Sequence, residues 1–188
     1  MLRRIARLLL RPAEEWDRIA DEKTSVVALL RDYILPLALL APIATVIGMK
    51  VFDRAWDPVH GYLVPSDRIL ATGAMTYLAI VGSIFVLAAI FVVLAPMYGG
   101  ARDYLSALKV AAYGAIPVLL AGAALLLPVL AIVGLVGLCH TLFLLWAGAR
   151  HVLKVPAGDG AEFIGISIVL MTLVSILAGA VVSAFGLF

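Results

Sequence analysis

The stretch that decides the fold is VAAYGAIPVLLAGAALLLPVLAIVGLVGLCHTLFLLWAGA, residues 110–149, which contains 40 residues and no Asp, Glu, Lys or Arg. A helix needs about 20 apolar residues to cross the roughly 30 Å hydrocarbon core of a bilayer. The stretch is therefore long enough for two crossings. Leu127 and Pro128 lie near its middle, where a short turn can reverse the chain. We predict two membrane helices that meet at these residues.

Three further runs free of charged residues flank this stretch, and they contain 17, 33 and 26 residues (33–49, 69–101 and 163–188). Each is long enough for one crossing. The sequence therefore predicts an all-α integral membrane bundle of five transmembrane helices, preceded by a basic amphipathic interfacial helix. We expect a cytoplasmic amphipathic segment over residues 1–32 and a transmembrane domain over 33–188, with spans at about 33–50, 70–97, 107–127, 129–149 and 163–186.

Composition excludes several classes of protein. Of the 188 residues, 64% are hydrophobic and 14% are charged, and the mean hydropathy is +1.14. In soluble domains, roughly 45–50% of residues are hydrophobic and about 25% are charged. A water-soluble enzyme is excluded because there is too little polar surface to cover it. The 14 basic and 12 acidic side chains are too balanced for a nucleic-acid-binding protein. The single cysteine, Cys139, excludes a disulfide framework within the chain.

The N-terminal residues form a pattern typical of a helix that lies on a membrane surface. Leu2, Ile5 and Leu9 recur at helical spacing, and arginines occupy another side. A signal peptide is the alternative, but Arg7 interrupts the apolar core and no small-residue cleavage site follows. We expect this segment to bind anionic lipid headgroups, with Trp16 at headgroup depth. The residues predicted to lie at the membrane surface are Arg3, Arg4, Arg7, Arg11 and Trp16.

Basic residues predict the orientation because Lys and Arg are retained on the cytoplasmic side. The segments 1–32, 98–109 and 150–162 carry eleven of them, whereas 50–68 carries three. With five spans, this predicts a multi-pass protein with a cytoplasmic N-terminus and a C-terminus on the opposite side of the membrane.

The motifs of common enzymes are missing. The predicted spans offer no pair of acidic residues for an aspartyl protease, and neither His-Glu-x-x-His nor Gly-x-Ser-x-Gly occurs. Asp53, Asp57 and His60 are a weak metal-binding pattern, because Pro58 and Gly61 disfavour a regular helix there. We predict a protein that is not an enzyme and needs no cofactor or metal.

Three residues are candidates for a polar interior: Tyr113, His140 and Thr141. A histidine inside a span can line a path, or it can simply bond to a neighbouring helix. Prolines in the first and third spans can kink helices, as transporters require. A small permease or channel for an unknown solute is thus the alternative function. The prolines concerned are Pro36, Pro42 and Pro117.

Small residues spaced four apart allow helices to pack closely. Ala44 and Gly48 have this spacing in the first span, and Ser175, Gly179 and Ser183 have it in the last. We expect these faces to pack inside the bundle or in a homo-oligomer.

After the basic amphipathic start, short motifs follow in a set order: Pro12 with Trp16, Tyr33-Ile34-Leu35-Pro36-Leu37, Tyr98-Gly99-Gly100, Ala112-Tyr113 with Pro117, and Gly148 before Val155-Pro156. This order resembles the bacterial branch of the Yip family, whose eukaryotic members interact with Ypt and Rab GTPases. The resemblance implies a five-span, N-inside protein of a bacterial inner membrane, with a periplasmic C-terminus, that binds partner membrane proteins or organises the membrane. GTPase binding is not expected, because the chain lacks the long N-terminal region and the Asp-Leu-Tyr-Gly-Pro type element of the eukaryotic members.

Overall fold

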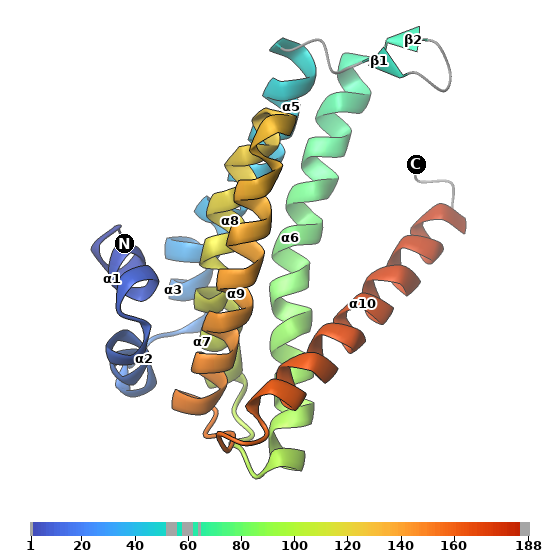
Figure 1. The fold of residues 1–188 in the computed structure, drawn as a ribbon. Coiled ribbons are helices and arrows are strands. Elements are labelled where there is room, and N and C mark those ends of the chain that lie inside the picture. Colours follow the sequence, from blue (N-terminus) through green and yellow to red (C-terminus); the bar gives the residue numbers. More distant parts are fainter. Residues whose placement is uncertain (1, 52–55, 58–61, 64, 185–188) are drawn as a thin grey trace.

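The computed structural model describes residues 2–51, 56–57, 62–63 and 65–184, and this part of the chain is almost wholly helical (Figure 1). Two short helices, α1 (Leu2–Leu10) and α2 (Pro12–Asp21), form an N-terminal hairpin. Five helical segments that follow are long and apolar enough to cross a membrane, which confirms the predicted all-α bundle. The one pair of strands in the described part is β1 (Trp56–Asp57) with β2 (Tyr62–Leu63), antiparallel, with Trp56 opposite Leu63.

Several of the five spans are built from more than one helix. The second contains α6 (Ser66–Leu94) and a 3₁₀ turn (Ala95–Tyr98), and the fifth is α10 (Gly160–Ala184). The first contains α3 (Val26–Leu29), a π-helical turn (Leu30–Ile34), α4 (Leu35–Ala38) and α5 (Leu40–Val51). The third contains α7 (Tyr104–Gly114), α8 (Ile116–Ala121) and a 3₁₀ turn (Gly122–Leu126). The fourth contains a 3₁₀ turn (Pro128–Leu130) and α9 (Ala131–His151).

The first span begins earlier than the expected residue 33. Ser25 caps it, since its side-chain oxygen accepts a hydrogen bond from the Ala28 amide at 3.2 Å. Arg31 and Asp32 neutralise each other through a 2.7 Å ion pair, which is why two charged residues are tolerated in the first turns of this span. The π-helical turn comes just before Pro36, whose ring cannot continue a regular α-helix ladder.

Burial is concentrated in one half of the bundle. The third span is 67% buried, whereas the fifth is only 11% buried. Figure 1 shows the reason, because α10 leaves the other helices at an angle after its first turns. Its early residues Phe163 and Ile164 are core residues, whereas later ones such as Val169 and Leu177 are exposed. The molecule thus has a compact half, which includes the hairpin, and an open half with apolar side chains on its surface.

The predicted packing faces have different environments. Ala44 and Gly48 are buried in α5, within the bundle. Ser175, Gly179 and Ser183 are exposed on α10, so in a single chain this face does not pack inside the bundle. The hydroxyl of Ser175 donates to the carbonyl of Met171 at 2.8 Å and is therefore satisfied within its own helix.

Two loops meet at the compact end of the bundle. Gly99 has a φ of 72°, a left-handed conformation that favours glycine, and it ends the helical run of the second span. A Cβ on the next residue, Gly100, would lie 2.8 Å from the Leu153 carbonyl oxygen. The Ala101 amide donates to that same oxygen at 2.8 Å. Tyr98-Gly99-Gly100 therefore joins the two loops that follow the second and fourth spans.

The hairpin packs on the bundle through an apolar face. Ile5, Leu8, Trp16 and Ile19 are all buried, and Trp16 and Ile19 are completely so. The Trp16 ring lies over Gly148 of α9, where a Cβ atom would come within 2.9 Å of the indole and 3.0 Å of a Val110 methyl group. The missing side chain at Gly148 thus leaves room for the indole ring.

We predict that Gly148→Ala destabilises the docked hairpin. The added methyl group overpacks a site that has no free space, a change that costs about 1–3 kcal/mol. Gly134→Ala, in the same helix, is the matched control, because a Cβ there meets nothing within 4 Å and alanine is the better helix former. Thermal unfolding in detergent should show a lower midpoint for Gly148→Ala than for Gly134→Ala; equal midpoints would contradict this packing.

Candidate functional site: the docked N-terminal hairpin

The centre of the hairpin is a buried carboxylate. Glu15 of α2 is 1% exposed and pairs with three arginines. Its oxygens lie 3.2 Å from Nε of Arg4, 3.0 Å from Nε of Arg7 and 3.3 Å from a terminal nitrogen of Arg18. A carboxylate removed from water is costly unless several donors satisfy it. Glu15 therefore ties the basic helix α1 to the acidic helix α2.

Arg4 connects the hairpin to the bundle. One terminal nitrogen donates to both carboxylate oxygens of Glu22 at 2.7 and 2.8 Å, and to the Tyr113 hydroxyl of α7 at 3.1 Å. Burial by itself lowers the pKa of Arg4, but the hydrogen bonds and charges of Glu22 and Tyr113 raise the pKa further, so the net shift is upward. The guanidinium is thus held charged at a half-buried position between three helices.

Lys109 makes a second connection from the bundle to the hairpin. Its side chain is 4% exposed, and Nζ donates to the carbonyl of Ile19 at 2.9 Å and to that of Glu22 at 2.6 Å. These carbonyls belong to the end of α2, where helical backbone oxygens lack partners and a cation is favoured. Lys109 of α7 thereby caps the C-terminal end of α2.

Aromatic rings fill the space between the charged groups and the bundle. The rings of Tyr33 and Tyr113 are 4.9 Å apart and cross at 71°, and those of Trp16 and Tyr113 are 6.5 Å apart and cross at 80°. Edge-to-face pairs of this kind add to the energy of burial. Tyr33 lies within the π-helical turn, so the irregular start of the first span places this ring against α7.

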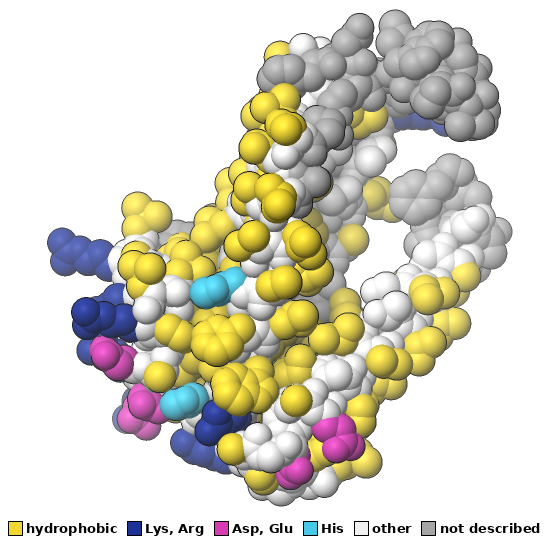
Figure 2. Space-filling view, viewed as in Figure 1, with side chains coloured by type: hydrophobic (Ala, Val, Ile, Leu, Met, Phe, Trp, Pro, Cys, Tyr) yellow, Lys and Arg dark blue, Asp and Glu magenta, His cyan; other side chains and the backbone are white. Residues whose placement is uncertain are grey.

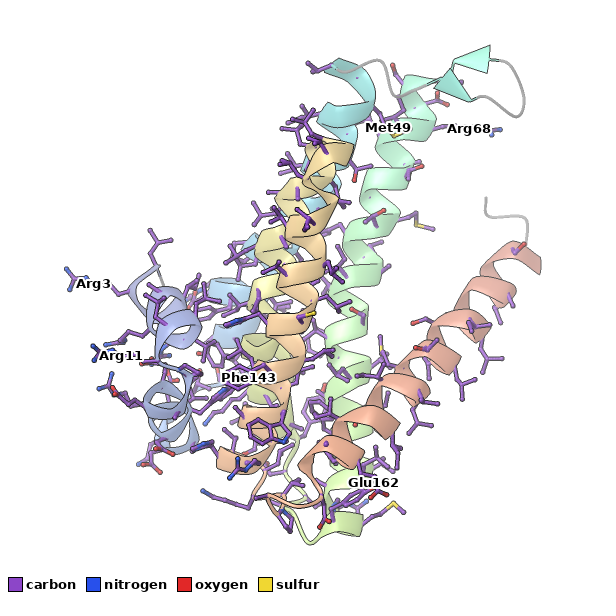
Figure 3. All side chains as sticks on the ribbon, viewed as in Figure 1. Arg3, Arg11, Met49, Arg68, Phe143 and Glu162 are labelled. Carbon is purple, nitrogen blue, oxygen red and sulfur yellow. The ribbon has the colours of Figure 1, made fainter. Side chains whose placement is uncertain are left out.

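The residues predicted to lie at the membrane surface divide into two groups. Arg3 and Arg11 point away from the bundle (Figure 3), and no ion-pair partner for either lies in the described part of the chain. Arg7 is 51% exposed despite its pairing with Glu15. Arg4 and Trp16 instead have protein neighbours, and their predicted place at the membrane surface stays a prediction. Arg4 is drawn inward by Glu22 and Tyr113, and the indole of Trp16 is buried.

The predicted polar interior is not a single site. Tyr113 is bonded to Arg4, whereas the Thr141 hydroxyl accepts a hydrogen bond from the Val118 amide at 3.0 Å, next to the Pro117 break between α7 and α8. His140 is partly exposed on α9, and its Nε2 is buried without a hydrogen-bond partner among the described residues. The three side chains therefore have separate environments.

Sequence reasoning missed Glu15, Glu22 and Lys109 as site residues. Glu15 is one of two acidic residues in the first turn of α2, a common position that does not indicate a site, and Lys109 precedes the charge-free run by one residue. Asp53 and His60 of the weak metal pattern lie outside the described residues, as does the side chain of Asp57. In the described part of the chain, no three His, Cys, Asp or Glu side chains are grouped so that they could hold a metal ion.

The comparison with protein families agrees with this architecture. The model of the Yip1 domain matches residues 6–179, from within α1 to near the end of α10. The chain belongs to the Yip1 domain family. This Yip1 domain is thus a multi-pass membrane protein, from a family that is not known as enzymatic. No curated protein and no solved structure matches the chain.

Within the Yip1 domain, the residues that carried the resemblance now have structural roles. Trp16 and Gly148 pack against each other, Tyr98-Gly99-Gly100 joins two loops, and Tyr113 receives Arg4. These positions all belong to the compact half or to the docking of the hairpin on it. The family match thus includes most of the hairpin together with the five spans.

We predict that Lys109→Met releases the end of α2. The substitution keeps an unbranched apolar stem but removes the lysine donor from the Glu22 carbonyl and leaves the Ile19 carbonyl with the Glu22 amide alone, a loss of about 1–3 kcal/mol. Amide hydrogen exchange over residues 12–21 should become faster, while exchange in the middle of α9 stays unchanged. Lys23→Met is the control, because Lys23 is exposed. Unchanged exchange in Lys109→Met would mean that the lysine does not hold the hairpin.

Proposed function

We propose that this Yip1 domain is a non-enzymatic protein of a bacterial inner membrane that binds partner membrane proteins or organises the membrane around it. Its hairpin lies on the cytoplasmic leaflet, and its C-terminus is periplasmic. The observation that carries the proposal is the contrast between a compact half, held by buried charges, and an open half that presents the apolar surface of α10.

The docked helix α1 has the surface that an interfacial helix needs. Successive residues are turned by about 100° around a helix, so its circumference divides into three faces. Ile5 and Leu8 are buried on the bundle, whereas Leu2 and Leu10 are 79% and 82% exposed. Exposed arginines form the third face. A helix with one lipid-facing and one basic face is suited to the boundary between acyl chains and anionic headgroups.

The charge distribution supports the proposed orientation. Figure 2 shows charged side chains gathered over α1 and α2 and at the adjoining end of the bundle, with hydrophobic side chains over α9 and α10. Outside the hairpin, the segments 98–109 and 150–162 at that end carry four basic residues, Arg102, Lys109, Arg150 and Lys154, whereas 50–68 carries three. Basic residues are retained in the cytoplasm, so this end is assigned to the cytoplasmic side.

Partner binding is assigned to α10 because this helix has the least contact with its own chain. Beyond its first turns it presents Val169, Leu173, Ile176 and Leu177, all exposed. Its small-residue face of Ser175, Gly179 and Ser183 is exposed as well and permits close approach of another helix. The permease alternative has less support, since Tyr113, His140 and Thr141 do not line one path.

We predict that α10 contacts a second membrane protein or a second copy. A photo-crosslinking amino acid at Leu177 should give a discrete protein adduct in native membranes. The same group at Leu70 of α6 is the control, because the two leucines are similarly exposed, at 65% and 56%. Identical diffuse labelling at both positions would contradict partner binding. Solute flux in liposomes that falls with His140→Ala would support the permease instead.

A further inference from the structure

An apolar groove runs between the hairpin and the fourth span. Its walls come from three helices: Leu9 of α1, Pro117 and Leu120 of α8, and Val136 and His140 of α9. The groove has a volume of about 370 Å³. Val136 and His140 also lie beside Cys139 on the open outer face of α9. An elongated apolar molecule therefore has room along the groove and against this face.

His140 is the one polar side chain among the residues that line the groove. The residue is partly exposed, but its Nε2 is buried and has no hydrogen-bond partner among the described residues, so a ligand in the groove reaches this atom when the imidazole turns toward it. A polar atom in apolar surroundings without a partner carries a free-energy cost that a hydrogen-bonding group can remove. The groove thus favours a mainly apolar ligand that also carries an ester or hydroxyl group.

The helix that forms one wall of the groove is positively charged on another face. Leu9 lies beside the lipid-facing side of α1, where Leu2 and Leu10 are exposed, and the arginine face of the same helix follows. Figure 3 shows Arg3 and Arg11 directed outward from the hairpin, where their guanidinium groups are open to an external anion. An apolar groove beside a cationic helix face is complementary to a lipid with an anionic head.

We propose that this groove binds one molecule of an anionic glycerophospholipid. One acyl chain lies along Leu9, Pro117 and Val136. The carbonyl oxygen of a glycerol ester accepts a hydrogen bond from the imidazole of His140, and the phosphate is attracted by Arg3 and Arg11. The assignment rests on the proposed position of α1 at the cytoplasmic leaflet. Only at that depth do the phosphate, ester and acyl groups of a lipid lie level with the arginines, with His140 and with the apolar groove, in this order.

The test uses full-length protein in vesicles with equal amounts of phosphatidylglycerol and phosphatidylcholine that carry identical acyl chains. Lipid retained per chain after mild extraction is counted by native mass spectrometry. Wild-type protein should retain one phosphatidylglycerol in preference to phosphatidylcholine. Val136→Phe, which fills the groove from an exposed position, should reduce retention by at least about fivefold, because the larger side chain takes the space of the acyl chain. His140→Leu should reduce it as well.

The controls separate failure of the groove from failure of the surface helix. Val169→Phe on α10 has a similarly exposed valine and should retain lipid like the wild type; unaltered helix content shows that each variant is folded. Arg3→Gln with Arg11→Gln should abolish the preference for phosphatidylglycerol. If the arginine variant loses this preference but Val136→Phe does not, the groove assignment is wrong and the surface helix stands. If the arginine variant keeps it, the proposed surface role of α1 fails too.

A second copy is the other occupant that this experiment detects. Were the groove covered by another chain, the spectra would show a dimer without retained phosphatidylglycerol, and Val136→Phe would weaken the dimer. That result overturns the lipid assignment.

Discussion

Charge burial at the junction of the hairpin and α7 is the constraint on which the rest of the structure depends. Glu15 and Lys109 are removed from water almost completely, and such groups are tolerated only when several partners satisfy them. Glu15 needs arginines from both α1 and α2, and Lys109 needs the carbonyl oxygens at the end of α2. Lys109 cannot keep its partners if the hairpin leaves the bundle, and Arg4 then loses the Tyr113 hydroxyl, whereas the arginines that pair with Glu15 all belong to the hairpin. Docking is therefore required by the charges, and the apolar contacts of Trp16 then strengthen it.

This constraint explains why the molecule is compact at one end and open at the other. The hairpin covers α7 and the C-terminal part of α9, and the core formed there includes Trp16, Tyr113 and Leu144. Toward the other end the helices contain few polar groups that would demand a partner, and α10 separates from them. In lipid, an apolar helix surface costs nothing, so the open half needs no protein cover to be stable. It is consequently the part of the molecule that is free to contact lipid or other chains.

The fold could be predicted from the sequence because membrane spans depend on local composition. Four charge-free runs, one of them divided at Leu127 and Pro128, predict five spans, and the described part of the chain has five. The docking of the hairpin on the bundle could not be predicted in the same way, because Arg4 and Tyr113 are 109 residues apart and no local pattern pairs them. A row of arginines also looks the same whether it faces headgroups or a buried glutamate. Arg3 and Arg11 differ from Arg4 only in what the folded chain places beside them.

The central claim is that the hairpin is docked on the bundle in the membrane and is held there by its buried charges. Asp17 of α2 and His151 of α9 lie side by side, with Oδ1 and Nδ1 2.7 Å apart. With Cys139→Ala as the background, Asp17→Cys and His151→Cys should be joined efficiently within one chain by a short bifunctional thiol reagent in native membranes. The yield should fall when Arg4→Gln is added. Absence of the crosslink, or a yield that Arg4→Gln leaves unchanged, would contradict the account.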